Sequence, residues 1–130
     1  MMLLKGMYLA NILVAGWISI SCLFFPERAA HTVFTDAFAY SEAFRLVGAL
    51  WGAIFLLSIL GLIWPQQMSL VLLFQLIYKS TWLLVAALPA LRSGQDFPRG
   101  MASFFLIWVV ILPFIIPWKQ LFSPVSQTVL

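Results

Sequence analysis

Four long apolar stretches constrain this chain more than any other feature of its sequence. They run over residues 6–25, 44–64, 69–91 and 101–118. A helix needs about 20 apolar residues to cross the hydrocarbon core of a bilayer. Backbone groups in lipid must also pair within the segment, so continuous apolar runs favour helices. We therefore expect an all-α integral membrane protein.

The composition supports this interpretation. Of the 130 residues, 64% are hydrophobic and 8% are charged, and the mean hydropathy is +1.06. Soluble domains are about 45–50% apolar and about 25% charged. These values exclude a soluble domain, a disordered tail and a nucleic-acid binder with a basic surface. The length leaves room for one transmembrane domain over residues 1–130.

The connections between the apolar stretches suggest how they pack. Pro26, Pro65 and the polar segment 92–100 end successive stretches. Proline lacks an N–H group and ends or kinks helices, so Pro89 and Pro113 predict kinks inside two spans. Short connections join antiparallel neighbours. We expect an antiparallel four-transmembrane-helix bundle.

The first connection is longer and has an amphipathic pattern. In residues 27–43, apolar side chains recur at the spacing of one helix face: Ala30, Val33, Phe34, Ala37 and Phe38. Such a segment lies in the membrane interface or covers the end of a bundle. Two interpretations stay open: a structural cap, or a lid over a cavity.

The charges do not fix the orientation in the membrane. The side of the termini carries Lys5 and Lys119, whereas the opposite side carries four arginines, at positions 28, 45, 92 and 99. The positive-inside rule places the arginine side in the cytoplasm, but a lysine beside the first span argues for the reverse. Both orientations remain open.

Lys79 is the most informative single residue. It lies about ten residues from either end of the third stretch, near the bilayer midplane. A charge at that depth costs a few kcal/mol on insertion scales. With Gln75, Tyr78, Trp82 and Ala86 it forms a polar and aromatic stripe on one face of the predicted helix. We expect this stripe to face the bundle or a partner.

No acidic residue shares the depth of Lys79. The four acids, Glu27, Asp36, Glu42 and Asp96, all lie in connections or at the ends of spans. Three arrangements would make Lys79 tolerable. It is neutral because burial disfavours the charge, it reaches water or the membrane surface, or it meets an anion from a ligand or another subunit.

Arg45 is a second candidate residue, at the start of the second span. It follows Glu42 by three residues, a spacing that allows an ion pair on a helix. The alternative is an anion site at the mouth of the bundle, because arginine matches carboxylate and phosphate groups. Gly48 and Gly52 form a GxxxG pattern that permits close helix packing. We favour packing within the bundle over packing across a dimer.

Two polar residues and three aromatic residues in or beside the spans have structural interpretations. Asn11 and Ser19 are candidates for hydrogen bonds between helices. Tyr8, Trp64 and Trp118 fall near the side of the termini and are typical of an interfacial aromatic belt.

Several chemistries have no signature in the sequence. One cysteine, Cys22, and one histidine, His31, do not make a disulfide or a metal or haem site within one chain. We find no HExxH, no GxSxG and no phosphate-binding glycine loop. We expect no cofactor, no metal and no catalytic residue, although a desolvated Lys79 beside Tyr78 could act as a base.

The start of the second span resembles a known family. Residues 41–48, Ser-Glu-Ala-Phe-Arg-Leu-Val-Gly, open the span with an arginine followed three residues later by glycine. With the chain length and the long first connection, this is similar to the DoxX-like group of small four-helix membrane proteins. The resemblance implies the four-helix layout. It implies no settled activity, although some members are partner subunits of redox or membrane systems. Lys79 lies outside the family pattern.

These observations lead to one functional hypothesis and one alternative. We expect a non-catalytic membrane protein that binds a lipid-like or anionic ligand, or that serves as an accessory subunit of a membrane complex, through the Lys79 stripe. The alternative is an oligomeric transporter or channel with Lys79 lining the path. The expected partners are membrane lipids and another subunit or a second copy, but no nucleic acid. The expected location is the cytoplasmic (inner) membrane of a bacterium.

Overall fold

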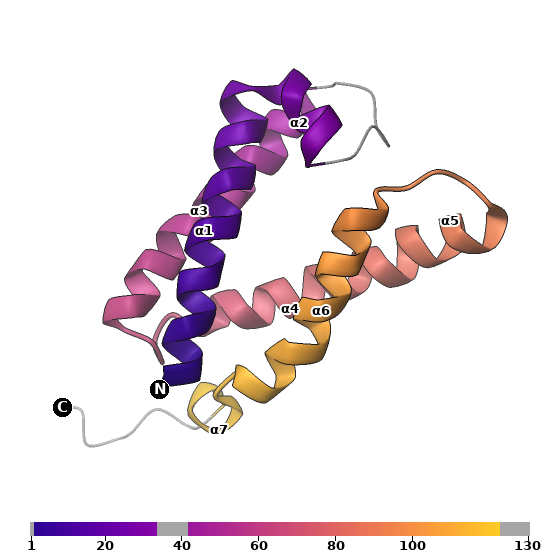
Figure 1. Cartoon of the computed structure of the whole chain (residues 1–130). Helices are drawn as coiled ribbons and strands as arrows, with labels where there is room; N and C mark the ends of the chain where they lie inside the picture. Colours follow the sequence, from indigo (N-terminus) through magenta and orange to yellow (C-terminus); the bar gives the residue numbers. More distant parts are fainter. Residues whose placement is uncertain (1, 34–41, 123–130) are drawn as a thin grey trace, which may run out of the picture.

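The computed structural model describes residues 2–33 and 42–122, and these residues form helices joined by short connections, without strands (Figure 1). The elements, in chain order, are α1 Met2–Phe24, α2 Pro26–Thr32, α3 Ala43–Ile63, α4 Leu70–Trp82, the π-helical turn η1 Leu83–Ala87, α5 Leu88–Ser93, α6 Arg99–Ile115 and α7 Trp118–Leu121.

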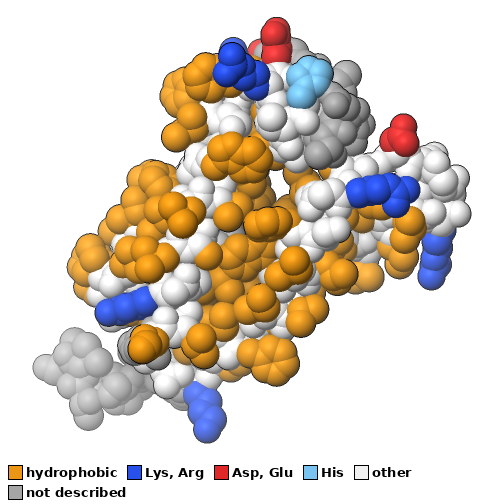
Figure 2. All heavy atoms as spheres, in the orientation of Figure 1, with side chains coloured by type: hydrophobic (Ala, Val, Ile, Leu, Met, Phe, Trp, Pro, Cys, Tyr) orange, Lys and Arg blue, Asp and Glu red, His pale blue; other side chains and the backbone are white. Residues whose placement is uncertain are grey.

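Three of the helices are long and apolar enough to cross a membrane: α1, α3 and the continuous helix Leu70–Ser93. The fourth apolar helix, α6, is shorter. In Figure 2 hydrophobic side chains cover the middle of the visible face, and charged side chains gather toward its two ends. The expectation of an all-α chain suited to a membrane is therefore confirmed.

The fourth helix ends earlier than the sequence pattern predicts. The apolar stretch continues to residue 118, but α6 ends at Ile115, and Ile116 is extended with ψ 127°. The physical reason is Pro117, because a residue that precedes proline is pushed out of the helical region. The chain then turns into α7, and the Trp118 indole N–H donates to the carbonyl of Pro113 at 2.8 Å.

α1 and α3 pack side by side over their whole length, and we call them the α1–α3 pair. Four glycines mark the contact, and their partners run in opposite directions along the two helices: Gly48 meets Cys22 and Leu23, Gly52 meets Ser19, Phe55 meets Gly16, and Gly61 meets Tyr8. Small residues let the two backbones approach closely. The pair is therefore antiparallel.

Tyr8 corrects one expectation. The sequence pattern places it in an interfacial belt, but it is fully buried against Gly61. Its hydroxyl donates to the carbonyl of Pro65 at 2.6 Å. Gly61 provides the space that the ring fills, and a buried tyrosine hydroxyl needs an acceptor. Tyr8 thus ties the start of α1 to the turn after α3.

α4, η1 and α5 form one continuous helix, and α6 packs against it in the opposite direction. We call this long helix and α6 together the α4–α6 pair. The π-helical turn lies just before Pro89. Proline has no N–H for the carbonyl four residues earlier, so this turn winds more widely. The extra residue shifts the buried face. Ala86, expected in the stripe, is exposed, and Ala87 is buried instead.

The two pairs contact each other less extensively than the helices within each pair do. α3 contacts α4, and α1 contacts α6. Trp51 on α3 reaches Tyr78 on α4, with 6.0 Å between ring centroids. Figure 1 shows the pairs diverging from the side of the termini toward the side that carries α2 and α5.

The described part of the first connection is the short helix α2. Ala30 and Val33 are buried and Thr32 is exposed, as the amphipathic pattern predicts, and Ala29, which lies off the predicted stripe, is buried as well. Its remaining apolar positions, Phe34, Ala37 and Phe38, lie outside the described residues.

Candidate functional site

The centre of the molecule contains polar side chains that are almost completely enclosed. Lys79 is 1% exposed, Gln75 is 0% exposed and Asn11 is 2% exposed. The Asn11 amide donates to Gln75 Oε1 at 2.8 Å, and the Gln75 amide donates to Asn11 Oδ1 at 3.2 Å. This reciprocal pair joins α1 to α4. It meets the expectation that Asn11 bonds between helices, and it fixes α4 one turn before Lys79.

Four aromatic rings surround the Lys79 ammonium group. Its Nζ lies 4.9 Å from the ring centroid of Trp51, 5.0 Å from Phe105, 5.0 Å from Trp108 and 5.4 Å from Tyr78. The rings come from α3, α4 and α6. We call these four residues the Lys79 cage. A desolvated cation gains about 2 kcal/mol over an aromatic face, so the cage offsets part of the cost of burying the amine.

Three rings of the cage also contact one another. Tyr78 meets Trp51 and Phe105 edge to face, each with 6.0 Å between centroids. Trp51 stacks on Phe105 at 6.1 Å, and Trp82 meets Phe105 edge to face at 5.3 Å. Edge-to-face and offset contacts are the preferred aromatic geometries. Tyr78, Trp51 and Phe105 are therefore oriented by their neighbours, whereas Trp108 contacts Phe104 at 6.3 Å.

Lys79 has no partner with the opposite charge among residues 2–33 and 42–122. The salt bridge found there joins Glu42 and Arg45, and none of the side-chain hydrogen bonds found there involves the Lys79 amine. Aromatic faces surround Lys79 in place of the carboxylate that usually stabilises a buried cation.

Two further polar groups near the centre lack a partner. The hydroxyl oxygens of Tyr78 and Ser58 are buried and make no hydrogen bond within the part of the chain that the structure describes. An unsatisfied buried hydroxyl costs about 1–3 kcal/mol. The core thus contains two hydroxyl groups without hydrogen bonds, in addition to the paired amides of Asn11 and Gln75.

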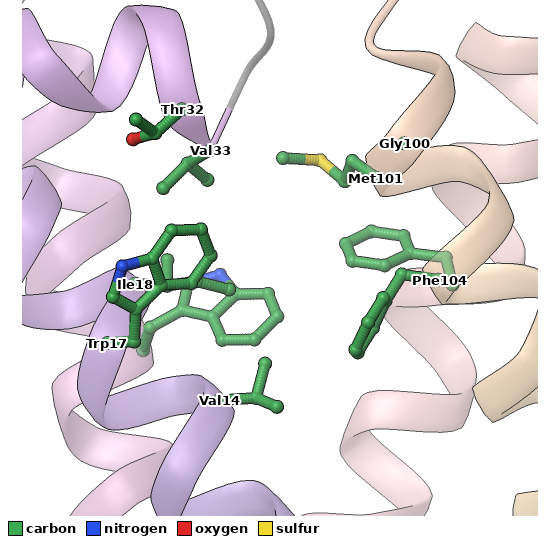
Figure 3. Close-up of a pocket in the computed structure, with 10 residues that line it drawn as sticks. Val14, Trp17, Ile18, Thr32, Val33, Gly100, Met101 and Phe104 are labelled. Carbon is green, nitrogen blue, oxygen red and sulfur yellow. The ribbon is translucent and has the colours of Figure 1, made fainter.

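An apolar cavity adjoins the cage, between α1 and α2 on one side and α6 on the other (Figure 3). Its volume is about 430 Å³. Val14, Trp17 and Ile18 face Met101 and Phe104 across it. Trp51 and Phe105 line both this central cavity and the Lys79 cage. Trp51 and Phe105 are therefore the two rings shared by the central cavity and the Lys79 cage.

The structure brings together part of the predicted site. Gln75 and Lys79 are buried, and Tyr78 and Trp82 are partly buried beside them. Sequence reasoning missed Trp51, Phe105 and Trp108, which complete the cage. Their aromatic character was visible, but three tryptophan or phenylalanine residues on two helices carry no signal of convergence, because many such residues face lipid.

Arg45 and Glu42 lie apart from Lys79. Arg45 Nη1 is 3.7 Å from Glu42 Oε1, and the two side chains are 53% and 74% exposed. Arg45 lines a separate hollow of about 340 Å³ with Phe24 and Arg28. An exposed ion pair of this kind contributes little to stability.

Gly48 and Gly52 both face α1 within the chain. The Ser19 hydroxyl donates to the carbonyl of Gly48 at 2.8 Å, and a Cβ on Gly52 would lie 2.9 Å from the Ser19 oxygen. These glycines position α3, and through Trp51 they set one wall of the cage.

Metal chemistry finds no support in the described residues, where no three His, Cys, Asp or Glu side chains gather. No protein-family model, no curated protein and no solved structure matches the sequence. The site is therefore interpreted from its own geometry.

Proposed function

We propose that this protein is a non-catalytic membrane protein that binds an acidic, lipid-like molecule in its central cavity, with the acidic group of the ligand paired to Lys79. The observation that carries the proposal is a fully buried amine without a carboxylate partner, next to an apolar cavity.

The charge argument favours an anionic ligand. A buried cation is strongly stabilised by a paired anion and by hydrogen bonds to it. The cage provides ring faces only, which are weaker partners than a carboxylate or phosphate. The free hydroxyl of Tyr78 lies on the next residue and offers a second donor to the same acidic group.

The cavity argument favours a hydrocarbon tail. The lining consists of aliphatic and aromatic side chains, apart from Thr32 and Gly100. A hydrocarbon tail fits such a lining because it buries no polar group that needs a hydrogen bond. Trp51 and Phe105 stand between cavity and amine, so binding requires these rings to move aside.

The proposal includes a membrane arrangement. α6 forms the fourth span of an antiparallel bundle, since its 17 residues reach about 25 Å, close to the hydrocarbon thickness. A DoxX-like layout in a bacterial cytoplasmic membrane is part of the same proposal. Its support is the opening of α3, where Arg45 and Gly48 occupy the first turns.

Native mass spectrometry from mild detergent tests this function, with palmitate as the probe. We expect one palmitate to bind the wild type, and Lys79→Met to weaken binding at least tenfold, as expected for the loss of a charge-assisted hydrogen bond worth about 1.5–3 kcal/mol. Methionine removes the amine and keeps an unbranched apolar side chain that is one atom shorter than lysine.

Lys5→Met is the matched control, because it removes an exposed lysine near the start of α1. Binding that is equal in Lys79→Met and Lys5→Met would overturn the proposal. Binding of hexadecanol as tight as that of palmitate would show that the cavity recognises the tail without the acid, and would also refute the role of Lys79.

A further inference from the structure

A second apolar depression lies on the opposite flank of α6. It runs between α6 and the η1–α5 part of the long helix and has a volume of about 390 Å³. We call it the α6 groove. Its α6 residues are Arg99, Ala102, Ser103 and Leu106, whereas the central cavity uses Gly100, Met101, Phe104 and Phe105. The two sites share no residue, so they can be tested separately.

The groove has a polar end and an apolar body. Arg99 stands at the first residue of α6, with its guanidinium carbon 4.8 Å from the Phe97 ring centroid. Below it the walls are leucine and alanine side chains, including Leu84, Ala87 and Leu106. A cation at the end of a hydrocarbon channel matches the two parts of an amphiphile.

No acid neutralises this end. None of the groove residues is acidic, and among residues 2–33 and 42–122 no salt bridge involves Arg99. Arginine presents its donors in a planar fork that matches a phosphate group.

The dimensions fit one leaflet of a membrane. From Arg99 to Leu106 the groove follows seven residues of α6, about 10 Å of helix. Half of the hydrocarbon core is about 15 Å thick. A lipid whose phosphate contacts Arg99 would thus place the first part of one acyl chain along the groove, within its own leaflet.

Small side chains on both walls shape the groove. Ala87 in η1 is buried and lines one wall. On α6 the facing positions are also small, Ala102 and Ser103. Small residues on both walls leave the space that an acyl chain needs.

We propose that the α6 groove is a binding site for one anionic phospholipid, with the phosphate on Arg99 and one acyl chain between η1–α5 and α6. Charge complementarity selects an anionic lipid over a zwitterionic one.

Lipid titration followed by native mass spectrometry tests the groove, with phosphatidylglycerol and phosphatidylcholine of identical chains as probes. We expect the wild type to bind one phosphatidylglycerol at least fivefold more tightly than phosphatidylcholine, as expected for about 1 kcal/mol from one arginine at the surface. Arg99→Gln should abolish that preference.

Arg92→Gln is the matched control, since Arg92 is an exposed arginine in the last turn of α5 and does not line the groove. It should change the preference less than twofold. Ala102→Leu should weaken the binding of both lipids without changing any charge. Equal effects of Arg92→Gln and Arg99→Gln would show general surface attraction and overturn the proposal.

Circular dichroism checks the fold of Ala102→Leu, and Lys79→Met separates the two sites. If Ala102→Leu loses its helical circular dichroism, the Arg99→Gln and Arg92→Gln comparison alone decides the case. If Lys79→Met abolishes palmitate binding but keeps the lipid preference, the two sites are independent. Loss of the lipid preference in Lys79→Met would contradict the assignment of the lipid to the groove.

Discussion

The α1–α3 pair and the α4–α6 pair are packed by opposite means. In the first, glycines bring two backbones together, and a Cβ added at Gly48, Gly52 or Gly61 would lie within 3.0 Å of a side chain on α1. In the second, large rings keep the helices apart, and a cavity lies on each flank of α6. Both pairs are antiparallel and apolar. Side-chain size therefore decides which region is closed and which can hold a ligand.

This difference assigns separate roles to the two regions. The α1–α3 pair has little free space at its contact, so its structure tolerates few changes. The α4–α6 pair contains Lys79 and the unpaired hydroxyl of Tyr78, and a cavity borders each flank of α6. A region of that kind is less stable than a fully packed core, and functional sites often have this property.

The largest expected effect comes from adding a methyl group at the tight contact between α1 and α3. Gly61→Ala should lower the free energy of unfolding by about 3 kcal/mol, the upper part of the usual range for overpacking. The reason is that the new Cβ would lie 2.6 Å from the Tyr8 ring, which its hydroxyl holds in place. Unfolding in sodium dodecyl sulfate, followed by tryptophan fluorescence, measures the change.

Gly6→Ala is the control for this substitution, because nothing lies within 4 Å of a Cβ at Gly6. It should leave stability unchanged or raise it by up to about 1 kcal/mol. An equal loss in both variants would mean that backbone flexibility, rather than close contact with Tyr8, explains the effect.

A smaller effect of opposite sign is expected at the open region. Lys79→Met should raise the free energy of unfolding by about 2 kcal/mol, because an apolar side chain replaces a buried amine that lacks a carboxylate partner. The same unfolding titration measures it, with Lys5→Met as the reference. A loss of stability would mean that the ring contacts outweigh the cost of burying the amine, and that the two regions are more alike than we infer.

The smallest expected effect concerns the bond that joins the two pairs. A double-mutant cycle with Asn11→Leu, Gln75→Leu and the double variant should give a coupling energy of about 0.6 kcal/mol, the average for polar contacts between membrane helices. The unfolding free energies of the four proteins provide it. A coupling of zero would indicate that the reciprocal amide bonds of Asn11 and Gln75 do not stabilise the contact between α1 and α4.

The sequence predicted the three longest helices closely and the fourth less well. The predicted spans 6–25, 44–64 and 69–91 correspond to helices at 2–24, 43–63 and 70–93. Apolar length alone determines such spans, because lipid forces backbone groups to pair locally. The end of α6 was missed because Pro117 acts on the residue before it, which the apolar pattern does not record.

At the site, the sequence identified the unusual residue but not its surroundings. A lysine in the middle of an apolar span is conspicuous in any sequence, since a charge at that depth is costly. Which rings surround it depends on how α3, α4 and α6 cross. The π-helical turn before Pro89 also moved the buried face by one residue, which regular periodicity could not predict.

The sequence by itself therefore determined that the chain is helical, suited to a membrane, and carries a deeply placed Lys79. Those properties follow from local composition and from the backbone requirements of lipid. Only the tertiary structure decided that Tyr8 is buried, that Trp51, Phe105 and Trp108 converge on Lys79, and that open space lies on both flanks of α6. The physical reason is that side-chain packing depends on contacts between residues far apart in the chain, and such contacts leave no periodic pattern in the sequence.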